Sequence, residues 1–149
     1  MSDNLDVIIV DDDQDVCDII SDNIERFYTW GDVLAFTSAD EAISYCRNMK
    51  AGVAVFVLDV FMDNETGFGF LDKIADKFPM AYEDTIIITG NASDDVVNMC
   101  IASDINFLIE KPIRPYTLQL AVRAILAKYI RFAKKLLKDP ALAESIADL

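Results

Sequence analysis

The sequence predicts an α/β fold with a doubly wound, five-stranded parallel sheet. Short apolar runs alternate with longer amphipathic segments five times along the chain. Several of the runs are continuously apolar, as expected for strands that are covered on both faces. A strand followed by a helix, repeated in this way, favours parallel pairing with right-handed crossovers.

Each predicted element follows from its local pattern. The apolar runs are the predicted strands: Val7–Val10, Val33–Phe36, Val53–Leu58, Ile86–Ile88 and Phe107–Ile109. The amphipathic segments predict helices at about residues 14–27, 39–49, 67–78, 94–103 and 115–138. Ser38 and Ser93 precede acidic first turns and are suitable N-caps. Pro115 suits a first helical turn, so the last helix is expected to begin near Tyr116 and to stop at Asp139-Pro140.

Composition limits the class of protein. The chain has 149 residues, 53% of them hydrophobic and 26% charged, which fits one globular domain. Its formal charge of −13 argues against nucleic-acid binding. The N-terminus is polar, and no apolar run approaches the roughly 20 residues needed to span a bilayer. The cysteines lie far apart in a chain without histidine, so we expect buried free thiols and a cytoplasmic protein without membrane insertion: Cys17, Cys46 and Cys100.

Polar residues follow four of the five predicted strands, at the sheet edge where ligands bind in such folds. They are Asp11, Asp12 and Asp13, then Asp59, Thr89 and Lys111. Two like charges about 4 Å apart repel by roughly 4 kcal/mol at an effective dielectric near 20, so the acids require a positive partner. Clustered carboxylates suit Mg²⁺, while a hydroxyl and an ammonium suit phosphoryl oxygens. This combination predicts a site that stabilises a phosphoryl group in transfer.

These motifs, in this order, resemble the receiver domain of two-component response regulators over about residues 5–127. Asp11 and Asp12 match the family's acidic pair, and Asp59, at the end of V-A-V-F-V-L-D, matches its phosphoacceptor. Thr89 in I-I-I-T-G matches the family's Thr/Ser, and Lys111-Pro112 matches a pair that is usually joined by a cis peptide bond. Met62 and Gly67 fit the pattern after the acceptor.

The resemblance implies a flavodoxin-like (βα)5 receiver fold with an extended C-terminal helix. It also implies a Mg²⁺ site in which Asp12 binds directly, Asp11 mainly through water, and the main-chain carbonyl of Phe61 is a further ligand. Asp59 would be both metal ligand and nucleophile. Thr89 and Lys111 would contact the phosphoryl oxygens, and Asp13 would be peripheral.

The function that follows is a phosphorylation-activated switch of a histidine–aspartate phosphorelay, acting as a stand-alone response regulator. Its expected partners are a histidine kinase or histidine phosphotransfer protein and a downstream protein target. It would be an autocatalytic phosphoacceptor that loses its own phosphate, not a turnover enzyme. A degenerate receiver acting as a phosphorylation-independent interaction module is the alternative. A haloacid-dehalogenase-type phosphatase would need a second acid where Phe61 stands.

Three departures from the family pattern bear on the mechanism. Asp63 replaces the usual proline four residues after the acceptor. Leu108 occupies the place of the switch aromatic, with Phe107 one residue earlier. Phe61 is bulky and apolar where many relatives carry a polar residue. An apolar ring orders no attacking water, so a long phosphoryl lifetime is expected.

The chain is expected to divide into a receiver domain, 1–127, and a C-terminal helical extension, 128–149. The first segment holds eight basic and 23 acidic residues, whereas 128–138 holds five basic residues and no acid. A heptad seam is expected on the last helix: Leu118, Val122, Ile125, Tyr129, Phe132 and Leu136. A separate basic stripe comprises Lys128, Arg131, Lys135 and Lys138. These features predict a homodimer, or docking to a partner helix, through residues 125–138. The alternatives are packing on the protein's own sheet and, less favoured by charge, a membrane surface.

Overall fold

The computed structural model describes residues 4–147 and contains one five-stranded parallel sheet, in the order β2-β1-β3-β4-β5. The strands are β1 (Val7–Val10), β2 (Val33–Phe36), β3 (Val55–Asp59), β4 (Thr85–Thr89) and β5 (Phe107–Glu110). β1, β3 and β4 are buried along their whole length, as their continuous apolar sequences require. The predicted fold class is confirmed.

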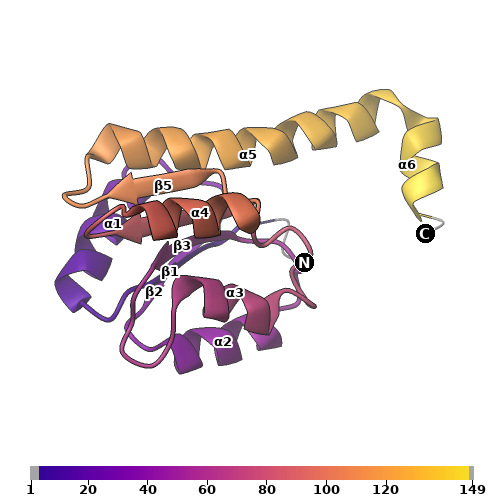
Figure 1. Cartoon of the computed structure of the whole chain (residues 1–149). Coiled ribbons are helices and arrows are strands. Elements are labelled where there is room, and N and C mark those ends of the chain that lie inside the picture. The colour runs from indigo at the N-terminus through magenta and orange to yellow at the C-terminus, as the bar shows by residue number, and fades with distance from the viewer. Residues whose placement is uncertain (1–3, 148–149) are drawn as a thin grey trace.

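Helices cover both faces of the sheet (Figure 1). They are α1 (Gln14–Glu25), α2 (Ala39–Asn48), α3 (Gly67–Ile74), α4 (Asp94–Ala102), α5 (Pro115–Lys138) and α6 (Pro140–Ala147). α1 and α5 share one hydrophobic cluster with the sheet, and α2, α3 and α4 share the other. This arrangement leaves the loops after the strands together at one edge.

Local sequence fixes most helix starts. The side chains of Ser38 and Ser93 accept hydrogen bonds from backbone amides of the first turns of α2 and α4, as predicted, and Thr66 does the same for α3. α3 ends at Ile74, although the pattern predicted a helix to about residue 78. Pro79 disfavours helical geometry at Phe78, whose side chain is buried although the residue lies beyond the end of α3.

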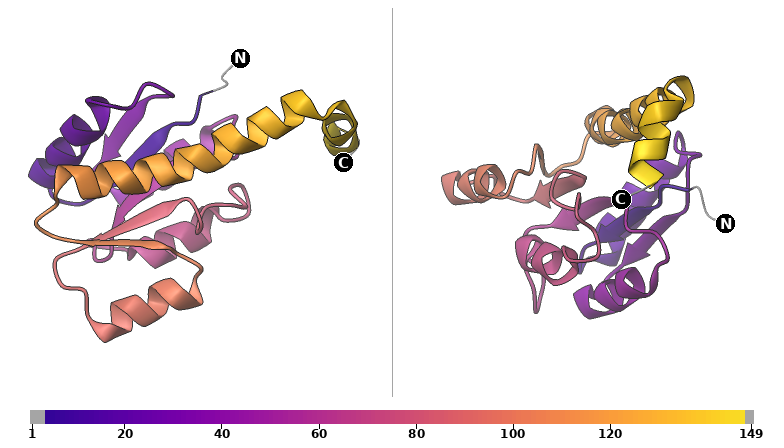
Figure 2. Two further views of the ribbon diagram at one scale, coloured as in Figure 1. Left: turned by 90° about the horizontal axis from the view of Figure 1, so that it is seen from above. Right: turned by 90° about the vertical axis from the view of Figure 1, so that its right-hand side faces the viewer.

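α5 continues well beyond the sheet (Figures 1 and 2). Its 24 residues correspond to a length of about 36 Å at 1.5 Å per residue. A five-residue strand such as β4 covers only about 17 Å. The predicted helix over residues 115–138 is observed, and Asp139 interrupts it in a non-helical conformation. The short helix α6, which was not predicted, turns away from the axis of α5.

The expectations about the cysteines and about membrane-spanning helices can be compared with the described residues. All three cysteines are buried free thiols. Between residues 4 and 147, no helix combines the length and apolarity that crossing a membrane requires. The first three residues of the proposed receiver domain, 1–3, and the last two of the proposed C-terminal extension, 148–149, lie outside the described residues.

Candidate functional site

Three carboxylates meet where β1 and β3 end. The two strands pair in parallel with Val10 beside Leu58, which brings the residues after β1 next to the end of β3. Carboxylate oxygens of Asp11, Asp12 and Asp59 all lie within 4.8 Å of one another. Asp11 is 1% exposed and Asp59 8% exposed, whereas Asp12 is open to solvent. Such a partly buried cluster of hard oxygen ligands is suited to a divalent cation.

The two buried carboxylates are costly to ionise. Burial, reinforced by the neighbouring charge of Asp11, raises the pKa of Asp59 from 3.8 to about 6. Burial also raises the pKa of Asp11, although the backbone amide of Asp13 and the ammonium of Lys111 oppose that rise. The cluster therefore favours the arrival of a positive charge.

Lys111 brings one positive charge to the cluster from the end of β5. Its Nζ lies 3.4 Å from Oδ2 of Asp11 and 3.8 Å from Oδ2 of Asp59. The backbone amide of Lys111 donates to the carbonyl of Thr89 at 2.8 Å, and the Lys111–Pro112 peptide bond is cis. One ammonium beside three carboxylates leaves the cluster negative overall.

Thr89 ends β4 at the same edge. Asp59 pairs with Ile88 across the β3–β4 ladder. Thr89, the next residue of β4, therefore lies beside the three carboxylates. Its buried hydroxyl donates to the carbonyl of Asn91 at 3.1 Å and accepts from the amide of Asn91 at 3.2 Å. The structure therefore brings together every side chain that the strand-end argument selected, apart from Asp13.

The sequence matches the response regulator receiver domain family over residues 7–123. The chain belongs to this family.

Individual relatives agree with the assignment. Regulatory protein VanR of Enterococcus faecium is 30% identical over 132 residues, which cover 85% of this chain and 52% of VanR. The chain thus spans about half the length of that relative. Chemotaxis protein CheY4 of Vibrio cholerae has a similar fold, with a TM-score of 0.71 at 19% identity over 82% of this chain and 98% of CheY4. One chain of the CheX-CheY-BeF3-Mg²⁺ complex of Borrelia burgdorferi gives a TM-score of 0.68 at 20% identity, covering 82% and 89% of the two chains.

The loop after Asp59 in this receiver domain is tight and carries an exposed ring. The amide of Gly67 donates to the carbonyl of Val60, and Phe61 pairs with Thr66 in an isolated bridge. A Cβ atom at position 67 would lie 2.8 Å from the carbonyl oxygen of Asp59, so only glycine allows this close approach. The Phe61 side chain is 67% exposed, and a metal-binding role for its carbonyl stays a prediction.

Asp13 has a structural role in the receiver domain. Its side chain accepts from the amide of Asp15 at 2.9 Å and caps α1. Its own amide donates to Asp11 Oδ1 at 2.9 Å, which orients that buried carboxylate. The expectation that Asp13 is peripheral to the cluster agrees with this geometry.

Leu108 and Phe107 lie on opposite faces of β5. Leu108 packs against the cluster that includes α3 and α4, whereas Phe107 packs against the cluster that includes α1 and α5. Both side chains are partly buried. Since neighbouring residues of a strand face opposite ways, Phe107 is on the wrong side to take the place of an aromatic at position 108.

A partly buried ion pair, which no sequence pattern indicated, lies at the end of the sheet opposite to Asp59. Asp84, 1% exposed, directly precedes β4 and accepts hydrogen bonds from the Lys128 ammonium and the Tyr129 hydroxyl of α5. These partners lie 44 and 45 residues away, so no local pattern reveals them. Lys128, which the sequence grouped with the basic stripe, is therefore engaged within its own chain, because its charge is paired with Asp84.

Proposed function

We propose that this receiver domain is a phosphorylation-activated switch that accepts a phosphoryl group on Asp59 with the help of Mg²⁺. The observation that carries this proposal is the convergence of three carboxylates with the Lys111 ammonium at the edge where β1, β3 and β5 end. Such a site places negative ligands for a metal and a positive group for phosphoryl oxygens around one carboxylate.

The donor set fits Mg²⁺, which takes one or two carboxylates and completes its shell with water and phosphate oxygens. Asp11, Asp12 and Asp59 would hold it, together with the Phe61 carbonyl. The bound ion would neutralise charge on the phosphoryl oxygens. The Borrelia burgdorferi CheX-CheY complex contains Mg²⁺ with BeF3, which supports the same choice of metal here.

In the proposed reaction, a carboxylate oxygen of Asp59 attacks phosphorus and the P–N bond of a phosphohistidine donor breaks. The product is an acyl phosphate on Asp59 and a free histidine on the donor. Lys111 contacts the transferred group, since its ammonium already lies 3.8 Å from Asp59. The Thr89 hydroxyl can bind a phosphoryl oxygen only by turning its proton away from the Asn91 carbonyl. That change of partner links the site to the loop before α4.

The expected partners are a histidine kinase or histidine phosphotransfer protein as donor and a protein target that reads the phosphorylated state. Family membership supports this part of the proposal. Transfer from a panel of phosphorylated histidine kinases would identify the donor by the fastest rate.

A labelling experiment tests the assignment. The protein is incubated with acetyl phosphate and Mg²⁺, and intact mass spectrometry follows the addition of one phosphoryl group. Wild type and Asp63→Asn, an exposed acid in the same loop, are expected to label, while Asp59→Asn and a sample in EDTA are not. Equal labelling of Asp59→Asn would overturn the assignment. No labelling of wild type would favour the phosphorylation-independent interaction module.

A further inference from the structure

The face of α5 that is buried differs from the face that is open to a partner. Leu118, Val122 and Ile125, the first half of the predicted heptad seam, are buried in the protein's own core. The seam continues with Tyr129, which is partly buried beside Asp84. It therefore anchors α5 to its own sheet, and only its last residues project beyond the sheet.

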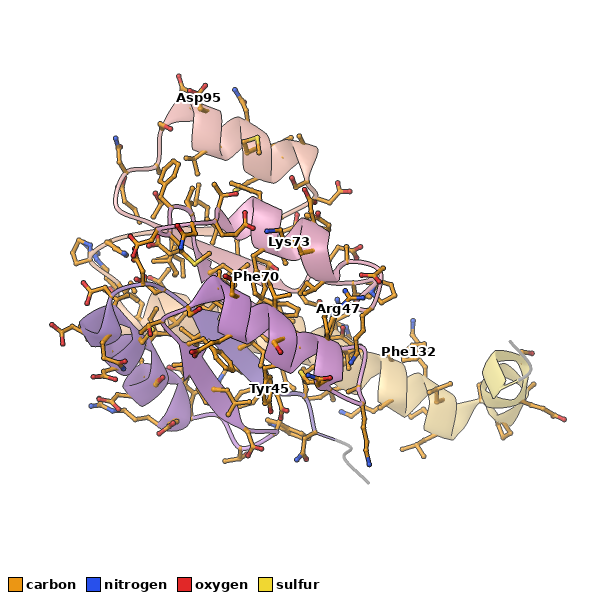
Figure 3. The ribbon with its side chains drawn as sticks, turned by 90° about the horizontal axis from the view of Figure 1, so that it is seen from below. Tyr45, Arg47, Phe70, Lys73, Asp95 and Phe132 are labelled. Atoms are coloured by element: carbon orange, nitrogen blue, oxygen red, sulfur yellow. The ribbon has the colours of Figure 1, made fainter. Side chains whose placement is uncertain are left out.

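A second apolar stripe runs along the neighbouring face of α5. Leu126, Ile130, Ala133 and Leu137 recur at steps of four, three and four residues. Leu126 is 8% exposed, Ile130 is partly buried, and Leu137 is 85% exposed. Burial thus falls steadily as the helix leaves the sheet (Figures 1 and 2). Phe132 lies on the same projecting part (Figure 3) and is 47% exposed.

This stripe borders a hollow at the end of the sheet opposite to Asp59. Phe27 and Trp30, from the connection between α1 and β2, line it together with Arg123, Leu126 and Ile130 of α5, and its volume is about 250 Å³. Trp30 also lines an adjoining hollow that reaches Ala133. Trp30 is 51% exposed. The backbone at the next residue, Gly31, packs so closely on the Leu5 carbonyl that any side chain there would collide with it. The loop therefore holds an open aromatic surface in place.

Charges on the two elements beside this surface are complementary. The exposed acids of α1 recur at steps of three and four residues: Asp15, Asp18, Asp22 and Glu25. The projecting end of α5 carries only basic charges: Arg131, Lys134, Lys135 and Lys138. α1 and α5 lie side by side over the same face of the sheet. A basic helix laid along α5 would therefore meet the acids of α1.

We infer that the projecting end of α5 docks into the Trp30 hollow of a second copy, forming an antiparallel, two-fold symmetric dimer. With Ile130 at the axis, Leu137 of one copy lies opposite Arg123 of the other and enters the hollow beside Trp30. Lys134 and Lys138 of the entering helix then lie alongside the acidic face of α1. The exchange is reciprocal, so each copy both inserts its helix end and receives its partner's. This places the sequence-predicted homodimer on the stripe of Leu126, Ile130, Ala133 and Leu137.

Sedimentation velocity on the unphosphorylated chain, over a range of concentrations, tests the inference. Wild type is expected to form a dimer, and Leu137→Asp is expected to weaken it by about a hundredfold, since two buried leucines are lost per dimer. Leu120→Asp is the matched control, because Leu120 lies on the same helix and is 72% exposed away from the stripe. Leu137 is 85% exposed within one copy, so its replacement should not disturb the fold, which circular dichroism verifies.

Trp30, the single tryptophan, reports directly on the hollow. Its emission is expected to shift to shorter wavelength as concentration rises in wild type and Leu120→Asp, but not in Leu137→Asp. Wild type that stays monomeric, or a dimer that survives Leu137→Asp but not Leu120→Asp, would overturn the inference. The interface lies away from Asp59, so this test is independent of the proposed phosphorylation.

Discussion

The acid cluster should lower the stability of the metal-free protein, and Asp59→Asn is the substitution that reveals it. The amide keeps the shape of the carboxylate but cannot ionise. Asp59 has its pKa raised from 3.8 to about 6, chiefly by burial and then by Asp11. Ionisation at neutral pH therefore opposes folding at this position, and Asp59→Asn is expected to make the protein more stable.

The magnitude follows from the same shift. A shift of about two pKa units corresponds to at most about 3 kcal/mol. Water at the open side of the cluster reduces this free-energy cost to about 1–2 kcal/mol. For a domain of this size, 1 kcal/mol moves the melting temperature by about 2–4 °C. Asp59→Asn should therefore melt several degrees above wild type in EDTA at pH 7.5.

The pH dependence has a definite sign. Asp59 is protonated in both folded and unfolded chains well below pH 3.8, and ionised in both well above about pH 6. Between these limits the unfolded chain gives up its proton first, so wild type loses stability relative to Asp59→Asn as the pH rises. The advantage of the variant should grow from pH 4 to pH 6 and then level off.

Urea unfolding in EDTA, followed by circular dichroism at several pH values, measures this difference. Asp63→Asn makes the same change of charge at an exposed position and should differ little from wild type. Added Mg²⁺ should stabilise wild type more than Asp59→Asn, because only wild type retains all three carboxylates. Equal stability of wild type and Asp59→Asn at pH 7.5, or a gain that does not change between pH 4 and pH 6, would refute the reasoning.

Three further predictions concern single side chains. Lys111→Ala should bind Mg²⁺ at least as tightly as wild type in calorimetry, because it keeps the carboxylates and loses an ammonium that repels the metal. Phosphorylation of this variant should no longer change hydrogen exchange in α4 and β5, and an exchange response equal to that of wild type would count against a role for Lys111. Phe61→Asn should shorten the lifetime of the acyl phosphate about tenfold, because an amide can hold the attacking water; tenfold corresponds to about 1.4 kcal/mol in the activation barrier. The decay of labelled protein measures this lifetime, and an unchanged rate would show that the Phe61 ring does not control the access of water to the acyl phosphate. Lys128→Met should destabilise the protein by about 2 kcal/mol in urea, because the buried Asp84 carboxylate loses its charged donor. Lys50→Met, at an exposed position outside α5, should change the stability by less than about 0.5 kcal/mol, and similar effects of the two substitutions would contradict the importance of the Lys128–Asp84 pair.

The sheet, its layers and the contents of the candidate site could all be predicted from the order of the residues. Continuous apolar runs such as Val7–Val10 indicate strands covered on both sides, and the residues after parallel strands must share one edge. The proximity of Asp11, Asp59 and Lys111 could therefore be predicted from their positions after predicted strands in the chain. The length of α5 was predictable for a similar reason, because its apolar pattern, its start at Pro115 and its stop at Asp139-Pro140 are all local in the sequence.

The free face of α5, by contrast, depends on contacts that form only in the folded chain. The spacing of apolar residues indicates that a helix has a buried side, but two adjacent stripes on α5 have nearly the same spacing. The sheet covers the one with Val122 and Ile125 and leaves the one that ends at Leu137 open. The pairing of Lys128 with Asp84 is settled in the same way. Such contacts join residues distant in the chain, and their energies depend on burial and distance, which exist only once the chain has folded.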